Sequence, residues 1–455
     1  MKKFLLKTFL GSALMAGLLS SCGEDRSGEY YALISSKSWM YETMQQYYLF
    51  YQDLPDKEEL NFFDTPANFL SATVSDKDKK NGYTFSHIDS IPESRSSMSE
   101  YPCFGFEGAL IRTSSGDYAI RVIYTEKDSP AEKAGLKRGD WIIAADNKAI
   151  TSNDYNTYIK APAKPYTFTM GTYNGEGFDT IPTPITMPQP EYVKINNLLK
   201  TSIVTAGNRK AAYLLYNSFG EDDTQDLQQA MTQLAAEQPT DVILDLRYNP
   251  GGYVNTSMVL ASMLAPAEAV GKTYINLLYN DKREEKTTFL IDAAYRTGGT
   301  TFSYNNLYII TSGETASASE AVINGLKPYM QGKLFQVGTA TFGKNLGQEL
   351  FNSEEAPQLN FWLTTFYLAN SEGFYDYFDN GLPADYTIEE DFSGELGELG
   401  NNTDALLKPV LTHLETGAFP AVENPAEQAT KTSRNKYNTT VVYNSIAAKS
   451  KKLKK

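Results

Sequence analysis

Two short runs in the second half of the chain carry residue types that could perform acyl transfer. Residues 315–320 read Thr-Ala-Ser-Ala-Ser-Glu and place Ser317 and Ser319 at a turn that enters a predicted helix. Residues 341–344 read Thr-Phe-Gly-Lys and end in Lys344. A nucleophilic serine needs a base that accepts its proton, and the whole chain contains only two histidines. The two runs therefore predict a serine nucleophile paired with a lysine base.

Lys344 has to lose its charge before it can act as a base. An exposed lysine has a pKa of about 10.4 and is almost fully protonated at neutral pH. Burial disfavours the ammonium form, and Phe342 beside Gly343 offers apolar, tight surroundings. A lone lysine on such a loop would more simply be solvated. Lys327 is a rival base, which we expect to face solvent.

Residues 249–252, Asn-Pro-Gly-Gly, could form an oxyanion hole. Negative charge develops on the carbonyl oxygen during acyl transfer, and one donor aimed at it contributes roughly 10²–10³-fold in rate. Glycines let the backbone approach that oxygen closely. Without the serine run, the same residues would be read as an ordinary Pro-Gly turn.

The pattern of elements from about residue 195 predicts an α/β core in which helices cover a sheet. One buried-type strand runs directly into the serine turn. We expect strands at 211–216, 241–246, 273–278, 307–310 and 359–367, and helices at 223–234, 254–264 and 404–414.

Residues 101–190 have a different character, with short β-runs and glycine-containing turns. Residues 129–135 read Ser-Pro-Ala-Glu-Lys-Ala-Gly, a short helix ended by glycine, and 141–145 follow as a strand. This succession resembles the PDZ domains of bacterial proteases. The resemblance implies that a peptide adds as an extra strand.

The same resemblance implies that backbone N–H groups around Phe104, Gly105 and Phe106 hold the carboxylate of that peptide. Cys103 stands where such domains have the first glycine of the loop, so the chain departs here from the pattern that confers terminal-carboxylate specificity. A PDZ-like module that serves only as a structural lid is the alternative. Cys103 itself is interpreted as a small apolar residue.

Three strings together resemble the carboxyl-terminal processing (tail-specific) serine peptidases of bacteria and plastids. They are 245–252, 316–320 and 341–348, in this order behind the PDZ-like string. The resemblance covers roughly residues 100–420 and implies a multidomain α/β protein. Its parts would be a helical N-terminal domain, a PDZ-like β-rich domain and an α/β peptidase core of the ClpP/crotonase type.

The resemblance also implies roles for individual residues. Ser317 would be the nucleophile, Lys344 the general base and Gln348 the residue that orients the lysine. The oxyanion donors would be the N–H groups of Gly251 or Gly252 and of Ala318. The family usually spaces serine and lysine by 25 residues, which here is the spacing of Ser319, whereas Ser317 lies 27 residues before Lys344. An insertion within 328–333 would explain the difference, and Ser319 stays the alternative nucleophile.

The first 22 residues are predicted to be a lipoprotein signal peptide. A positive start and a short apolar run lead to Leu-Ser-Ser-Cys, which resembles the bacterial lipobox and makes Cys22 the lipidation site. The acidic residues after Cys22 resemble the surface-export signals of Bacteroidetes lipoproteins. A plain signal peptide cleaved near Ser21 is the alternative. Residues 28–98 are expected to form the helical N-terminal domain and residues 195–420 the peptidase core.

Composition limits the partners. The formal net charge of −14 argues against nucleic acid. Two isolated histidines and two cysteines cannot supply the usual set of zinc ligands, so no metal is expected. The sequence shows no phosphate-binding loop, and no other cofactor is expected. Residues 424–455 are polar and end in lysines, which predicts a disordered basic tail. The sequence does not indicate an oligomeric state.

The sequence thus predicts a serine endopeptidase that cleaves unstructured or C-terminal segments of envelope proteins. Its lipid would anchor it in the cell envelope, at the outer membrane, facing the periplasm or the surface. The alternative is a non-catalytic PDZ-containing surface lipoprotein that binds peptides.

Overall fold

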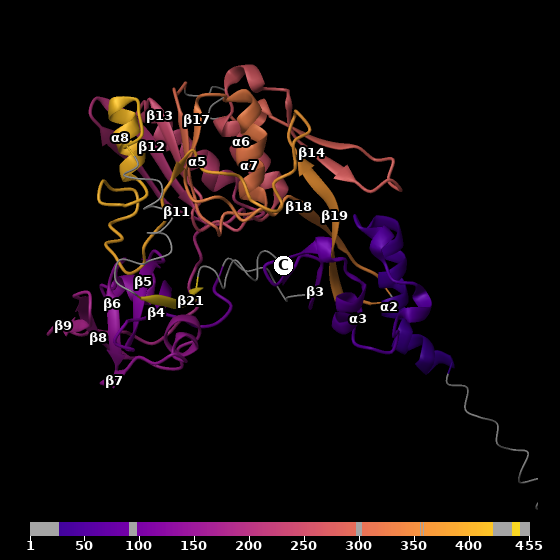
Figure 1. Cartoon of the computed structure of the whole chain (residues 1–455), viewed down its shortest axis with the longest axis horizontal. Helices are drawn as coiled ribbons and strands as arrows, with labels where there is room; N and C mark the ends of the chain where they lie inside the picture. Colours follow the sequence, from indigo (N-terminus) through magenta and orange to yellow (C-terminus); the bar gives the residue numbers. More distant parts are fainter. Residues whose placement is uncertain are drawn as a thin grey trace, which may run out of the picture.

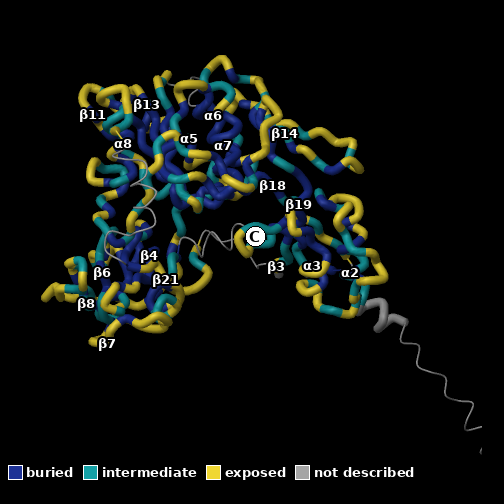
Figure 2. Tube along the Cα trace, viewed as in Figure 1, coloured by how far each residue is buried: buried dark blue, intermediate teal, exposed yellow. Residues whose placement is uncertain are grey.

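Figure 1 shows three parts of the chain in a computed structural model, which describes residues 27–90, 98–296, 303–354, 356–357, 359–421 and 439–445. The α/β core lies at the top of the view. The PDZ-like domain and the N-terminal domain lie below it, at opposite ends of the molecule. The buried backbone is concentrated in the core and extends into both smaller parts (Figure 2).

The N-terminal domain begins with helix α2 (Ser27–Tyr47) and continues with α3 (Pro66–Thr73). The side chain of Thr65 caps α3 by accepting a hydrogen bond from the Asn68 N–H, 3.2 Å away, and Pro66 occupies the first turn. Short 3-10 turns lie between and after these helices. They are η1 (Tyr51–Asp53), η2 (Lys57–Glu59) and η3 (Asp76–Asp78).

The helices expected in the N-terminal domain do not extend through its last part. Residues 79–90 form the short strands β1 (Lys79–Lys80), β2 (Tyr83–Thr84) and β3 (His87–Ser90). Strand β3 pairs antiparallel with β19 (Leu359–Ala369), which belongs to the core. Pairing with a distant strand, which local sequence patterns do not reveal, determines the structure here.

The PDZ-like domain is an antiparallel sheet ordered β10-β8-β6-β5-β4-β21, with β7 on β6 and β9 on β8. Two short helical segments accompany it, α4 (Pro130–Lys133) and the π-helix η4 (Asn156–Lys160). The strands are β4 (Phe106–Arg112), β5 (Tyr118–Thr125), β6 (Trp141–Ala145), β7 (Lys148–Ala149), β8 (Thr167–Tyr173), β9 (Phe178–Thr180), β10 (Ile185–Thr186) and β21 (Thr440–Asn444).

The core sheet has six strands in the order β11-β12-β13-β16-β17-β20, and all neighbours except β11 and β12 are parallel. The predicted strands of this sheet are confirmed. The bounds are β11 (Leu198–Ala206), β12 (Arg209–Tyr216), β13 (Asp241–Asp245), β16 (Leu307–Thr311), β17 (Leu334–Gly338) and β20 (Tyr386–Thr387).

Side chains alternate between the two faces of this sheet, as the two-residue period of a strand requires. One face packs against helices α5 (Thr224–Ala236), α6 (Val254–Leu264) and α7 (Ala318–Leu326). The other face packs against α8 (Lys408–Thr416) and against apolar residues of the PDZ-like domain. The predicted helix 254–264 is confirmed, whereas α8 begins four residues later than expected.

A second, antiparallel sheet was not expected. Its order is β15-β14-β19-β18, and β3 also pairs with β19. The predicted strands at 273–278 and 359–367 are confirmed, but both belong to this sheet rather than to the parallel one. The predicted strand at 273–278 is β14 (Thr273–Tyr279), and the one at 359–367 is β19. The remaining strands of this sheet are β15 (Thr287–Leu290) and β18 (Leu346–Phe351).

The expectation of a disordered tail over 424–455 is wrong for residues 439–445. They include β21, which pairs antiparallel with β4 of the PDZ-like domain. The apolar Val-Val-Tyr stretch within β21 has the β-propensity that this pairing needs. Cys22, the predicted lipidation site, lies outside the described residues. None of the described helices is both long and apolar enough to span a bilayer.

Candidate active site

Ser317 lies at the N-cap of α7, directly after the turn that follows β16. Its backbone has φ 56° and ψ −116°, a conformation that costs free energy for a residue with a side chain. Such a strand–turn–helix corner holds a serine hydroxyl at the edge of a sheet, where a substrate can approach. Only 8% of Ser317 is exposed in this structure.

The serine turn is fixed to the loop that follows β13. The Thr315 hydroxyl donates to the Leu246 carbonyl oxygen at 2.8 Å, and the Ala316 N–H donates to the Asn249 carbonyl oxygen at 3.1 Å. The Ser319 hydroxyl also donates to the Asn249 carbonyl oxygen, at 3.0 Å, and Ser319 is fully buried. The hydroxyl of Ser319 is thus engaged in holding the turn.

Gly251 and Gly252 lie against the serine turn with φ angles of 109° and 140°. A Cβ atom on Gly251 would be 2.8 Å from the Ser317 Cβ and 3.1 Å from the Ala318 nitrogen. A Cβ atom on Gly252 would be 2.2 Å from the Phe219 carbonyl oxygen. Both positions therefore need glycine for conformation and for space.

The three predicted oxyanion donors are not equivalent. The Gly251 N–H donates to the Asn249 side-chain oxygen at 2.9 Å, so it is already engaged. Among the described residues, nothing accepts a hydrogen bond from the N–H of Gly252 or of Ala318. Ala318 opens α7, where backbone N–H groups have no partner within the helix. Gly252 and Ala318 remain the candidate donors.

Glu320 connects the serine turn, which contains Ser317, to the lysine loop, residues 341–344. Its Oε2 accepts from the Ser317 N–H at 2.8 Å and from the Lys344 N–H at 2.7 Å. These two backbone nitrogens can therefore be no more than 5.5 Å apart. Its Oε1 accepts from the Gly343 N–H at 2.6 Å and from the Thr341 hydroxyl at 2.5 Å.

The Glu320 carboxylate is fully buried, and burial raises its pKa above the ordinary value, although its four hydrogen bonds oppose this effect. The sequence interpretation gave Glu320 no role. The signal was present, because a glutamate three residues after an N-cap serine is the spacing of a capping box.

Lys344 is buried, with 2% exposure, and lies under the N-terminal domain. Its Nζ is 5.1 Å from the centre of the Phe85 ring. Burial lowers the pKa of His87, although its contacts with the Phe85 carbonyl oxygen and Asp89 oppose this effect. Phe85 and Phe342 share one apolar cluster with Ala316 of the serine turn. No sequence pattern marked Phe85 as part of this site.

Gln348 lies on β18, opposite Thr364 and directly after a bulge. Its Nε2 is buried and has no acceptor among the described residues. The orienting role expected for Gln348 stays a prediction.

The loop expected to bind a peptide terminus has one residue with positive φ, Gly105 at 74°. A Cβ atom there would be 2.5 Å from the Ser129 Cβ. Cys103 is buried, and its N–H donates to the Glu191 carbonyl oxygen at 2.8 Å. The side chains of Phe104 and Phe106 belong to the apolar core of the PDZ-like domain, so only the backbone of this loop could contact a ligand.

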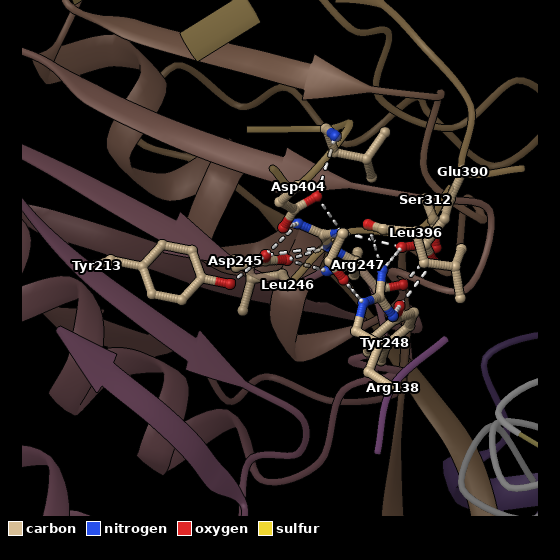
Figure 3. A network of polar contacts seen from close by, with 12 residues as sticks. Arg138, Tyr213, Asp245, Leu246, Arg247, Tyr248, Ser312, Glu390, Leu396 and Asp404 are labelled. Atoms are coloured by element: carbon tan, nitrogen blue, oxygen red, sulfur yellow. Dashed lines mark hydrogen bonds and ion pairs between the residues drawn. The ribbon is translucent and has the colours of Figure 1, made fainter. Parts of the chain in front are cut away.

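Figure 3 shows a buried ion network that includes Arg247 and Tyr248. These residues directly precede the glycine loop, residues 249–252. Arg247 is fully buried, and its Nη2 is 2.7 Å from Asp245 Oδ2 and 2.7 Å from Asp404 Oδ2. Glu390 contacts both Arg247, at 3.0 Å, and Arg138 of the PDZ-like domain, at 2.5 Å. Burial alone would raise the pKa of Glu390, but the two arginines lower it to about 2.

Three family models match this chain. The model of peptidase family S41 matches residues 210–388, that of the peptidase S41 N-terminal domain matches 35–87, and that of the PDZ domain matches 121–164. The S41 match contains the glycine loop, the serine turn and the lysine loop.

Two curated relatives are carboxy-terminal processing proteases. The chain is 27% identical over 275 residues to the one from Bartonella bacilliformis, covering 58% of this chain and 57% of that protein. It is 26% identical over 251 residues to CtpB from Bacillus subtilis, covering 54% and 48%. This chain thus spans about half the length of these curated relatives.

A solved crystal structure has a similar fold over most of the chain. It is that of a candidate S41 protease from Bacteroides fragilis, with a TM-score of 0.73 and 28% sequence identity. The match covers 83% of this chain and 96% of that structure.

Proposed function

This chain belongs to peptidase family S41, and from that membership we propose that it is a serine endopeptidase with a Ser317–Lys344 dyad. The observation that carries the proposal is the Glu320 carboxylate, whose Oε2 accepts from the backbone N–H of both residues. A nucleophile and its base must be held at a constant separation, and a buried carboxylate bonded to the backbone of both residues supports such an arrangement.

In the proposed reaction, the Ser317 hydroxyl attacks the scissile carbonyl carbon while Lys344, as the neutral amine, takes the hydroxyl proton. The apolar cover of Lys344 supports this role, because desolvation favours the neutral form of a lysine. The N–H groups of Gly252 and Ala318 would stabilise the oxyanion of the tetrahedral intermediate. Lys344 would return its proton to the leaving amine, and water would then release the acyl group.

The proposed substrates are proteins or peptides cut in unstructured or C-terminal segments. Ser317 is 8% exposed, so a folded surface has little access to its hydroxyl. A PDZ domain that adds an extended peptide to its sheet would deliver such segments.

The test is cleavage of an unfolded reporter protein with an apolar C-terminus by residues 23–455. We expect cleavage by the unaltered chain and by Ser319→Ala, and a loss of at least about 10³-fold in kcat for Ser317→Ala and Lys344→Met. Thermal melting would show that each variant is folded. Equal cleavage by Ser317→Ala would reject Ser317 as the nucleophile. Peptide binding without cleavage by any form would favour the non-catalytic binding protein.

We further propose that the chain is anchored in the cell envelope through lipid on Cys22. The support is the lipobox-like string that ends at this residue. Cells given a clickable palmitate analogue should label the full chain and not Cys22→Ser. Labelling of both forms would contradict the proposal.

A further inference from the structure

Strand β21 comes from the C-terminal tail, yet it completes the sheet of the PDZ-like domain. Among the described strands it pairs only with β4, and β4 would be the edge of this sheet if β21 were absent. Thr440 is opposite Arg112, and Asn444 is opposite Ala109. Strand β4 begins at Phe106, directly after the loop formed by residues 103–105.

The tail strand fits the sheet edge with side chains as well as with its backbone. The Tyr443 ring stacks on Tyr155 with centroids 3.7 Å apart, and it packs against the apolar core of the PDZ-like domain. Tyr155 directly precedes η4, and Ile159 of η4 lies close to Gly108 of β4. Tyr443 therefore contacts the PDZ-like domain next to its short helix.

Both ends of the segment are held. At one end the Thr439 hydroxyl contacts the Ser393 hydroxyl, which belongs to the core, and Thr439 is buried. At the other end the buried Ser445 hydroxyl accepts a hydrogen bond from the Gly108 N–H at 2.8 Å. Because β21 is antiparallel to β4, the tail runs toward the loop at 103–105.

An extended peptide that docks on a PDZ domain adds a strand to an exposed sheet edge. Here residues 439–445 already occupy that edge. We propose that this segment is a built-in occupant of the peptide site of the PDZ-like domain, and that a substrate segment binds there only when the tail strand leaves. The inference rests on the peptide-binding role proposed above, but not on the identity of the nucleophile.

Tethering determines how strongly the tail competes. At an effective concentration on the order of 1 mM, a tethered segment with an intrinsic Kd on the order of 100 μM would occupy its site at about ten to one. An added peptide would therefore bind about tenfold more weakly than to a vacant edge.

A disulfide across the two strands provides a reversible lock. Arg112 and Thr440 are Cα partners with exposed side chains. Partners in an antiparallel pair lie about 4.5–5.5 Å apart, which a disulfide can span. The variant is Arg112→Cys with Thr440→Cys in residues 23–455, where the only other cysteine, Cys103, is buried.

The probe is a fluorescein-labelled synthetic peptide with the sequence of residues 438–446 and a free carboxylate. Its binding is measured by fluorescence anisotropy in a Ser317→Ala background, where cleavage plays no part. We expect the oxidised double-cysteine variant to bind the probe at least about tenfold more weakly than the same variant in its reduced form. The reduced variant should bind the probe with the affinity of the parent protein.

Tyr443→Ala weakens the tail alone and should tighten probe binding about tenfold. Val442→Ala is the matched control, because Val442 lies in the same strand, at the irregular position, with 45% exposure. Equal affinity of the oxidised lock, the reduced lock and Tyr443→Ala would overturn the proposal. The reporter assay tests the peptidase activity separately, so the two failures are distinguishable.

Discussion

At the residue scale, the site depends on groups that hold Ser317 in a conformation it would otherwise avoid. Its positive φ costs on the order of 1–3 kcal/mol, which the surroundings must offset. The Glu320 carboxylate accepts the Ser317 N–H and also fixes three donors of the lysine loop. Glu320 is therefore a positioning residue for both members of the proposed dyad.

Glu320→Gln should lower kcat on the order of 10²-fold with little change in KM. All four groups that contact the Glu320 carboxylate donate hydrogen bonds to it. The NH₂ group of a glutamine would therefore face a donor and would displace the backbone of either the serine turn or the lysine loop. The expected loss corresponds to about 2.7 kcal/mol in the activation free energy. Steady-state kinetics of reporter-protein cleavage measure both constants. Glu237→Gln, at an exposed position, is the control, and unchanged kcat in Glu320→Gln would contradict the positioning role.

Gly251→Ala should reduce kcat by at least about 10²-fold, because its Cβ would lie 2.8 Å from that of Ser317 and its φ is 109°. Gly313→Ala is the matched control, since a Cβ atom there has nothing within 4 Å and Gly313 has no positive φ. Kinetics and thermal melting of the two variants make the comparison. Similar kcat values in the two variants would show that position 251 does not require glycine.

At the element scale, the sequence predicted those parts that are marked by local apolar runs. The run at 241–246 has the length of a buried strand and the run at 254–264 that of a helix, and both elements are present. The second sheet was missed because its pairing joins segments far apart in the chain, such as β3 and β19. The cover that Phe85 gives to Lys344 depends on this pairing and could not be predicted.

The junction between the N-terminal domain and β19 contains a buried carboxyl group, Asp78. It accepts hydrogen bonds from the Thr364 hydroxyl at 2.6 Å and from the Tyr48 hydroxyl at 3.1 Å. Burial raises the pKa of Asp78 from 3.8 to about 6, although its hydrogen bonds oppose this effect. The folded state thus keeps this proton at pH values where the unfolded chain releases it.

The Asp78 contribution to the free energy of unfolding should therefore fall as pH rises from about 4 to about 6 and stay constant above that. The change would be on the order of 3 kcal/mol for a pKa raised by about two units. Urea unfolding of the parent and of Asp78→Asn at pH 4, 5, 6 and 7 measures it. The difference between the two proteins should change over this window. A difference independent of pH would mean that Asp78 is not protonated in the folded state.

At the scale of the whole molecule, the PDZ-like domain is joined to the core by a polar contact and an apolar one. Arg138 donates to the Tyr248 hydroxyl at 3.0 Å and to Glu390, and Tyr248 directly precedes the glycine loop. Apolar residues of β4, β5 and β6 share a cluster with the core sheet. The orientation of the PDZ-like domain is thus coupled to the loop beside Ser317.

Arg138→Met should lower the free energy of unfolding by about 3–5 kcal/mol, because it leaves buried polar groups without their partner. Lys133→Met, on the same domain, should change it by at most about 1 kcal/mol, since its ion pair with Glu191 is exposed. Urea unfolding gives both values. Hydrogen exchange should also become faster at residues 246–252 in Arg138→Met alone. Equal stability of the two variants would show that the network does not hold the domain.

The pairing of β3 with β19 has a consequence for biosynthesis. Ser90 pairs with Leu359, so the early strand has to wait for a partner that is translated much later. Contacts between such distant segments form slowly, because a long loop must close first. The apolar cover over Lys344 is therefore assembled near the end of chain synthesis. A nascent chain would therefore lack the complete proposed site until residues beyond Leu359 have been translated.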